Sequence, residues 1–124
     1  MKHEDKDLLL KDLCARLPYN PLVEYKGESY NVLGIAHGRL VLCKPFMSYT
    51  LKENPLVEEA KPYLFPFSSM TKEQKIRCQA IQDMGASYSH HLIDRYNEWH
   101  LDYRGLIEKG LAIDATDKNI YDYL

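Results

Sequence analysis

The sequence predicts an α+β fold: a small antiparallel β-meander packed with three to four helices, with the sheet either open or curled toward a barrel. Apolar residues alternate in a strand-like way within residues 22–43 and follow a helix-like spacing on both sides of that stretch. The chain has 124 residues, of which 45% are hydrophobic and 27% charged, as is typical of one globular domain. We therefore expect residues 1–124 to form a single domain.

The first predicted helix spans residues 5–17. The apolar residues at helical spacing form one stripe, made up of Leu10, Leu13, Cys14 and Leu17. Pro18 ends the helix, because the residue before a proline avoids helical backbone angles. Amphipathic helices of small domains usually pack inward, so we expect this stripe to cover the sheet rather than to bind a partner or a membrane.

Residues 22–43 predict three antiparallel strands joined by two short turns. The alternation of apolar and polar residues starts at Val23 and is interrupted by turn signals at residues 26–28 and 37–38. Gly34 interrupts the middle strand, where it predicts a β-bulge. A three-stranded sheet needs a cover on its apolar face, and the first helix is the nearest candidate.

Residues 45–66 are broken by four prolines and predict irregular structure, apart from a short fourth strand at residues 49–51. Residues 57–67 carry several large apolar side chains between prolines. We expect this segment to fold over the sheet. If it stays exposed, it forms a contact surface instead.

Two further helices are predicted after residue 70. Thr71 and Gln74 match the capping-box pattern, which predicts a largely solvated helix over residues 71–84. The next helix starts at residue 87 or 89 and reaches Trp99. We expect the indole of Trp99 to be buried, because a tryptophan offers a large apolar area to a core.

The stretch RGLIEKGLAI, residues 104–113, has two glycines at the spacing of a phosphate-binding loop. That loop needs Lys and then Ser or Thr directly after the second glycine, and here Leu and Ala follow it. A helix end explains the stretch better: Asp102 caps a short helix over residues 103–108, and Gly110 stops it in the left-handed conformation. Gly105 has no role in this interpretation except close packing.

No residue pattern predicts catalysis, a metal or a cofactor. His90 and Asp94 could share one helix face, but zinc needs at least three converging ligands and no such spacing is present. The three cysteines are far apart and predict buried free thiols. Glu58 and Glu59 are adjacent, so they point apart and predict surface charge rather than an acid–base pair. We therefore expect a protein that is not an enzyme.

The tyrosines predict a recognition surface. The sequence has ten of them, and tyrosine favours interfaces because it combines apolar area with a polar tip. Tyr103 beside Arg104 joins two residue types that are enriched at binding hot spots. Asp102, Tyr103, Arg104 and Tyr63 are the candidate binding residues. The alternative for these residues is structural, namely a buried tyrosine and an arginine that bridges two elements.

Charge and hydropathy exclude several classes of protein. The formal net charge is -2 and the Lys and Arg residues are scattered, which disfavours a nucleic-acid binder because such a protein needs a grouped positive surface. No apolar run approaches the roughly 20 residues that span a bilayer, and the first ten residues do not resemble a signal peptide. We expect a cytoplasmic protein that makes no membrane contact.

Three blocks of the chain carry a resemblance. LLLKDLCARLPY at residues 8–19, KPYLFPFSSMT at residues 61–71 and DYRGLIEKGLAIDA at residues 102–115 together resemble a group of small uncharacterised proteins of gut Bacteroidales phages and prophages. The resemblance covers most of the chain and is weaker at residues 20–55 and 75–88. It implies an accessory protein of a mobile element, made inside a bacterial cell, and it implies no activity, cofactor or catalytic residue.

The leading expectation for function is a non-enzymatic protein-interaction module that binds a host protein or another phage protein. The alternative is a protein that binds and sequesters a small ligand or nucleotide. The third expectation is a nucleic-acid binder that uses the face of its sheet.

Overall fold

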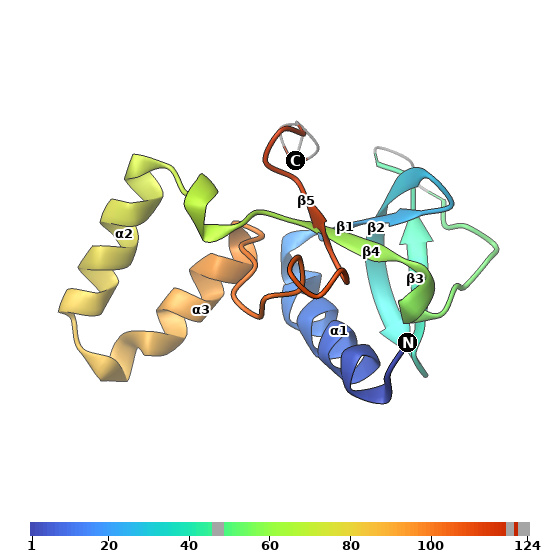
Figure 1. The fold of residues 1–124 in the computed structure, drawn as a ribbon, viewed down its shortest axis with the longest axis horizontal. Coiled ribbons are helices and arrows are strands. Elements are labelled where there is room, and N and C mark those ends of the chain that lie inside the picture. Colours follow the sequence, from blue (N-terminus) through green and yellow to red (C-terminus); the bar gives the residue numbers. More distant parts are fainter. Residues whose placement is uncertain (46–48, 119–120, 122–124) are drawn as a thin grey trace.

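A computed structural model describes residues 1–45, 49–118 and 121. The described strands are β1 (Leu22–Tyr25), β2 (Glu28–Ala36), β3 (Arg39–Cys43), β4 (Lys61–Leu64) and β5 (Ile113–Asp114). The described helices are α1 (His3–Arg16), α2 (Lys72–Asp83) and α3 (Ser89–Glu98), and short 3₁₀ turns cover Leu17–Tyr19, Val57–Glu59, Phe67–Ser69 and Ala86–Tyr88. Helix α1 and the sheet form the main body, and α2 and α3 form a hairpin at one end of it (Figure 1). The predicted α+β fold is confirmed.

Helix α1 covers the sheet as expected, but its buried face differs from the predicted stripe, because Leu9 belongs to it and Cys14 is exposed. The helix starts slightly earlier than expected, at His3, and ends at Arg16, after which Pro18 lies in a 3₁₀ turn. Leu9 and Leu13 are fully buried and belong to the same core cluster as apolar side chains of the first four strands. Burying one leucine side chain contributes about 1.5–3 kcal/mol, so this face of α1 is a main source of stability.

Strands β1, β2 and β3 form the predicted meander. Two-residue turns at residues 26–27 and 37–38 join them, and all four turn residues have positive φ angles, between 51° and 79°. Such turns match the right-handed twist of the strands that they connect. The register of the β2–β3 pair shifts between Val32 and Gly34, which confirms the predicted bulge.

Strand β4 lies where the sequence predicted a loop folded over the sheet, so the predicted loop was wrong. The expected packing is present in Tyr63 and Leu64, which are buried, whereas Phe67 is 40% exposed. Strand β4 pairs antiparallel with β1, and β5 pairs parallel with β4, which gives the order β3-β2-β1-β4-β5. The sheet formed by the described residues is therefore mixed and open, with β3 and β5 at its edges, and it is not a barrel. The fourth strand expected at residues 49–51 amounts to one isolated bridge between Thr50 and Cys43.

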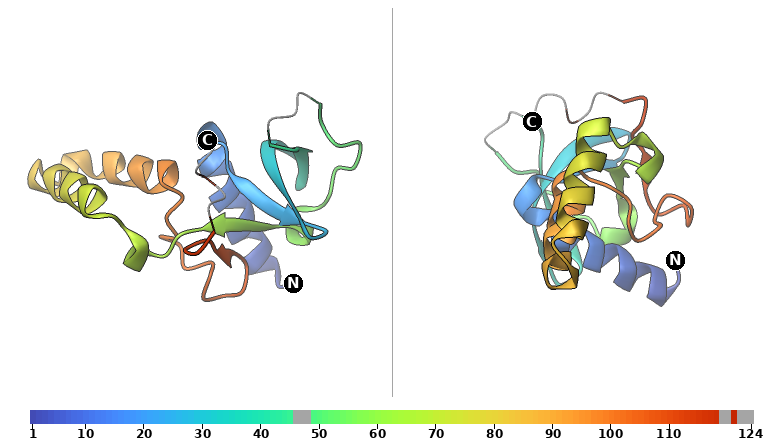
Figure 2. Two further views of the ribbon diagram at one scale, coloured as in Figure 1. Left: turned by 90° about the horizontal axis from the view of Figure 1, so that it is seen from above. Right: turned by 90° about the vertical axis from the view of Figure 1, so that its left-hand side faces the viewer.

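Helices α2 and α3 pack side by side and stand clear of the sheet in two perpendicular views (Figures 1 and 2). The predicted capping box is present: the Thr71 N–H donates to Gln74 Oε1 at 3.0 Å, and the Gln74 N–H donates to Thr71 Oγ1 at 3.1 Å. Gly85, with a φ of 105°, follows the end of α2 as expected. Trp99 is half-buried rather than buried, because it follows the end of α3 and lies beside an open cleft.

The helix predicted over residues 103–108 is absent, and this described segment consists of turns. The predicted end of that helix is nevertheless present: the N–H of Leu111 donates to the Leu106 carbonyl at 2.9 Å and that of Gly110 to the Ile107 carbonyl at 3.0 Å. These two hydrogen bonds and the Gly110 φ of 75° form a Schellman motif, which normally ends a helix. Gly105 has a φ of 73°, and nothing lies within 4 Å of the Cβ that another residue would add. Backbone conformation, and not close packing, therefore explains Gly105.

We expect Gly105→Ala to lower the free energy of unfolding by about 1–2 kcal/mol, because an L-residue is strained in the left-handed conformation. Gly34→Ala is the matched control, since Gly34 also has open space around it but lacks a positive φ. Urea denaturation of both variants and the wild type measures the difference. Equal stability of the two variants would contradict this explanation of Gly105.

Candidate functional site

The candidate residues Asp102, Tyr103 and Arg104 lie together just after α3, and each is held by the protein itself. The Asp102 carboxylate accepts the backbone N–H groups of Leu106 and Ile107 at 2.8 and 2.9 Å, so it caps the turn before the Schellman motif. The Tyr103 hydroxyl is 2.9 Å from Asn97 Oδ1 and donates to it. These contacts tie the segment after α3 to α3 itself.

Tyr63 does not join this group. Its side chain lies in β4, is 5% exposed, and belongs to a small apolar cluster with Leu22 and Ala115. The hydroxyl of Ser29, on β2, donates to the Tyr63 hydroxyl oxygen at 3.1 Å. The structure therefore brings three of the four candidate residues together and places the fourth inside the sheet.

Arg104 reaches a buried charge cluster in the main body. Asp12 and Arg16, on α1, are both fully buried and are joined by two hydrogen bonds of 2.9 Å between the guanidinium and the carboxylate. Arg104 Nη1 donates to the same carboxylate at 2.9 Å, and Arg16 Nη2 donates to the Leu101 carbonyl at 2.7 Å. Two guanidinium groups thus share one carboxylate. The cluster links α1 to the segment after α3, and the contact between Arg104 and Asp12 joins residues that are 92 positions apart in the sequence.

His100 lies next to this cluster and is 6% exposed. Its ring stacks on Tyr121, with centroids 3.7 Å apart and planes 10° apart. Burial, together with the positive charge of Arg16, lowers the pKa of His100 to about 3, so the ring is neutral at pH 7. Among the described residues, neither His100 Nδ1 nor Arg16 Nη1 has a hydrogen-bond partner. The sequence did not indicate His100 as a buried residue.

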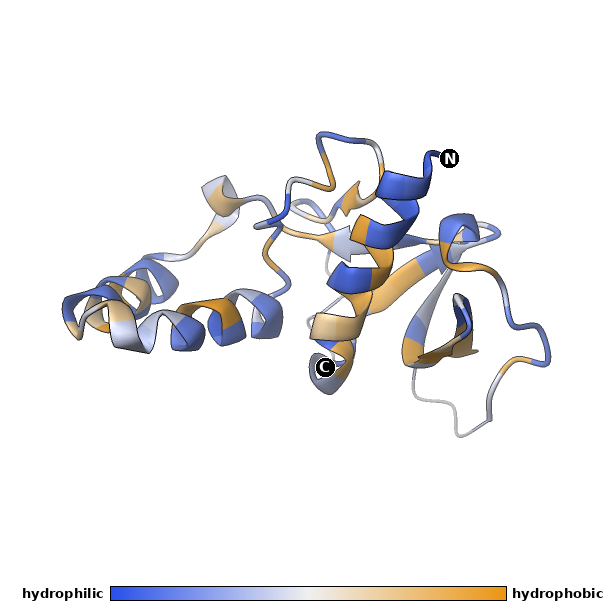
Figure 3. Ribbon diagram, turned by 90° about the horizontal axis from the view of Figure 1, so that it is seen from below, coloured by the Kyte–Doolittle hydropathy of each residue, from blue (hydrophilic) through white to orange (hydrophobic). Residues whose placement is uncertain are grey.

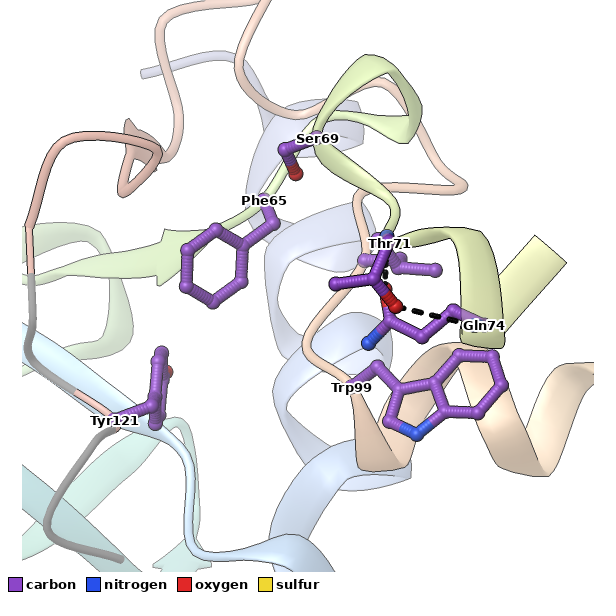
Figure 4. A pocket seen from close by; sticks show the side chains of 7 residues that line it. Phe65, Ser69, Thr71, Gln74, Trp99 and Tyr121 are labelled. Atoms are coloured by element: carbon purple, nitrogen blue, oxygen red, sulfur yellow. Dashed lines mark hydrogen bonds between the residues drawn. The ribbon is translucent and has the colours of Figure 1, made fainter.

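The described residues also line an aromatic cleft between the end of β4, the end of α3 and Tyr121. The cleft consists of two adjoining hollows of about 280 and 550 Å³, and Phe65, Trp99 and Tyr121 are walls of both. Ser69, Thr71 and Gln74 line the smaller hollow on the side of α2 (Figure 4). Sequence reasoning missed this cleft, because the three ring-bearing residues are far apart in the chain and give no local pattern.

The hairpin carries a second candidate surface. Within α2 and α3, all of whose residues are described, only Cys78 and Asn97 are buried. Exposed apolar side chains remain on the hairpin and on the turn that joins its two helices; we call them the hairpin surface, and they are Ile76, Met84, Tyr88 and Ile93. Apolar and hydrophilic residues alternate along both helices (Figure 3).

A groove of about 250 Å³ lies on the same hairpin. Ile81 and Met84 supply its apolar lining, and Arg77, His91 and Arg95 supply its polar lining. The groove therefore combines apolar contact area with positive charge, although Arg95 also pairs with Glu98 at 2.7 Å. Such a lining suits a partner segment whose apolar residues are flanked by carboxylates.

The other groups considered for chemistry do not assemble into a site. Within the described part of the chain, no cluster of three or more His, Cys, Asp or Glu side chains could hold a metal ion. Glu58 pairs with Lys6 at 2.7 Å, and the Glu59 carboxylate accepts the Leu56 N–H at 2.7 Å. Cys43 and Cys78 are buried as expected, whereas Cys14 is exposed, because it lies on the face of α1 that points away from the sheet.

Among the described residues, no helix is both long enough and apolar enough to cross a bilayer. Comparisons of the chain with protein-family models, with curated proteins and with solved structures found no match.

Proposed function

We propose that this protein is a non-enzymatic protein-interaction module, and that it binds its partner through the hairpin surface and the groove beside it. The observation that carries the proposal is the exposure of large apolar side chains on the hairpin of α2 and α3. The hairpin projects from the main body (Figure 1). Exposed apolar groups that gather on one element are typical of protein-binding sites. A partner segment with apolar and acidic residues fits the groove best.

Asp102, Tyr103 and Arg104 have a positioning role in this proposal. Tyr103 packs against Tyr96 of α3 with ring centroids 5.7 Å apart, while its hydroxyl bonds to Asn97. Arg104 ties the same segment to Asp12 of α1. The three residues thus fix the base of the hairpin relative to the main body, and a rigid base reduces the entropy that is lost when a partner binds.

The resemblance to phage and prophage proteins sets the partner that we propose to seek, a host protein or another protein of the same mobile element. Affinity capture from a Bacteroidales host, with and without the phage, supplies candidates. Each candidate is then purified, and its dissociation constant is measured with the wild type and with surface variants. Binding should weaken with added salt, because part of the attraction comes from arginine side chains.

We expect Ile76→Glu and Met84→Glu each to weaken binding of the purified partner by about ten-fold or more, since a charge replaces an apolar contact of roughly 1.4 kcal/mol or more. Leu33→Glu on β2 is the matched control, because Leu33 is 56% exposed, close to the 58% of Ile76 and the 54% of Met84. Titration calorimetry measures the three constants. Loss of binding in Leu33→Glu with retention in the two hairpin variants would contradict the proposal.

A further inference from the structure

We infer that the aromatic cleft is a binding site for a small molecule with a flat ring and no negative charge. This site is separate from the hairpin surface, and the inference does not depend on the proposed protein partner. Three properties of the cleft carry it: preformed ring walls, a suitable size, and a lining that disfavours anions.

The ring walls are held in place before any ligand arrives. The Tyr121 hydroxyl donates to the Tyr63 carbonyl at 2.9 Å and accepts the Leu22 N–H at 3.0 Å, which fixes its ring against residues of β4 and β1. The backbone N–H of Phe65 donates to the His100 carbonyl, and the Phe65 carbonyl accepts the Asp102 N–H, each at 2.8 Å. Preformed walls cost little ordering entropy on binding.

The ring side chains border one shared space. Phe65 and Tyr121 lie on one side of it, and Trp99 lies on the other beside Gln74 (Figure 4). The larger hollow, of about 550 Å³, falls within the roughly 300–1,000 Å³ of ordinary ligand pockets. Aromatic side chains bind flat rings by stacking, because their ring faces attract the polarised edges and faces of another ring.

The charge of the lining selects against anions. Among the described residues that line the two hollows there is no Lys or Arg, and Glu98 is the only charged side chain. His100 also lines the larger hollow and stays neutral at pH 7, because burial and Arg16 lower its pKa to about 3. Aromatic faces carry partial negative charge. Arg77, whose guanidinium lies 5.7 Å from the Trp99 ring centroid, and Arg95, which pairs with Glu98, adjoin the cleft but do not line it. A phosphate or carboxylate would therefore find no cation among the lining residues, whereas an uncharged or cationic ring meets no such cost.

Polar groups in the lining of both hollows can supply hydrogen bonds for ring heteroatoms. The smaller hollow ends at Thr71 and Gln74, whose side chains the capping box holds in fixed positions. Asn20 and Glu98, which pairs with Arg95 at 2.7 Å, line the larger hollow. A few placed polar groups in a mostly apolar lining are typical of sites that orient a small molecule.

Trp99 makes the inference directly testable, because it is the single tryptophan of the sequence and lines both hollows. The indole N–H resonance of Trp99 is followed by NMR during titration with adenine, adenosine, indole, nicotinamide and tryptamine. Adenosine 5′-monophosphate, indole-3-acetate and nicotinate are the matched anions. We expect at least one uncharged or cationic ring to shift the resonance saturably below 1 mM, and its anionic counterpart to bind at least ten-fold more weakly.

Variants locate the binding in the cleft. Tyr121→Leu and Phe65→Leu each remove one ring and should weaken binding by about 5- to 150-fold, the range for loss of one stacking contact. Tyr121→Phe retains the ring but removes the two hydrogen bonds that fix it, so it should weaken binding less than Tyr121→Leu does. Tyr49→Leu is the control, since Tyr49 is an exposed ring outside the cleft. Met84→Glu, which tests the hairpin surface, should leave ring binding unchanged.

Two results would overturn the inference. One is the absence of any saturable shift across the panel with the folded wild-type protein. The other is binding that is equally strong for the anions, or that is unaffected by both Tyr121→Leu and Phe65→Leu. Failure of the hairpin variants to affect a protein partner would leave this inference standing, because ring binding is tested with small molecules and with variants of the cleft itself.

Discussion

Asp12→Ala is expected to lower the free energy of unfolding by about 3–5 kcal/mol, because it removes the carboxylate that neutralises two arginines and leaves their charge uncompensated. Asp12 is fully buried and accepts hydrogen bonds of 2.9 Å from both Arg16 and Arg104. Arg16 is also fully buried and cannot recover its hydration in the folded state. Domains of this size are stable by only about 5–15 kcal/mol, so the loss is a large part of the total. Urea denaturation followed by circular dichroism measures it.

Two controls separate buried charge from other effects. Asp7→Ala removes an exposed carboxylate from the same helix, one whose only ion pair among the described residues is with exposed His3, and it should cost less than about 1 kcal/mol. Arg104→Met keeps the balanced pair of Asp12 and Arg16 and should cost clearly less than Asp12→Ala. If Asp12→Ala costs no more than Asp7→Ala, the buried cluster does not stabilise the fold.

The free energy of unfolding is expected to fall by about 2–3 kcal/mol between pH 6.5 and pH 4.5, because of His100. In the folded state its pKa is lowered to about 3, whereas a histidine of the unfolded chain titrates near 6.5. Below pH 6.5 the unfolded chain takes up a proton that the folded protein excludes, which favours unfolding by about 1.4 kcal/mol per pH unit. Stability from this group is thus present above pH 6.5 and is lost as the pH falls toward 3.

His100→Asn should remove most of this pH dependence, because asparagine does not titrate and tolerates the positive φ of 58° at this position. His91→Asn, at an exposed position, is the control and should keep the wild-type dependence. The paired carboxylates Glu28, Glu53 and Glu58 have pKa values lowered from 4.5, so their contribution to stability is lost as the pH falls through 4.5, and this part of the pH dependence remains in His100→Asn. An unchanged pH dependence in His100→Asn would show that another group causes the acid sensitivity.

Elements with a local signal were predictable from the sequence. The capping box at Thr71, the turns at residues 26–27 and 37–38 and the bulge at Gly34 all depend on a few neighbouring residues. Strand β4 was not predictable in this way. Pro62 within it argues against a sheet interior, since proline cannot donate to the ladder, and the register partner of Pro62 is Val23 on distant β1.

For the candidate site, too, only the features with a local signal were predictable from the sequence. The sequence indicated Asp102 as a cap and Gly110 as a left-handed stop, and both interpretations describe the segment well even though its helix is absent. It did not indicate that Trp99 would stay half-buried beside Tyr121 and Phe65. Whether an aromatic side chain is buried in the core or lines a cleft depends on which residues pack against it, and the sequence does not show these contacts.

The sequence by itself determined the α+β class, the order of the main helices and meander strands, and most turns and caps. These features follow from residue spacing and backbone preference over a few neighbouring residues, and they do not depend on contacts with distant parts of the chain. Only the tertiary structure decided that Asp12 meets Arg104, that His100 is buried on Tyr121, and that the hairpin leaves its apolar side chains exposed. Those outcomes depend on contacts between residues that are far apart in the sequence, and no short stretch of sequence contains that information.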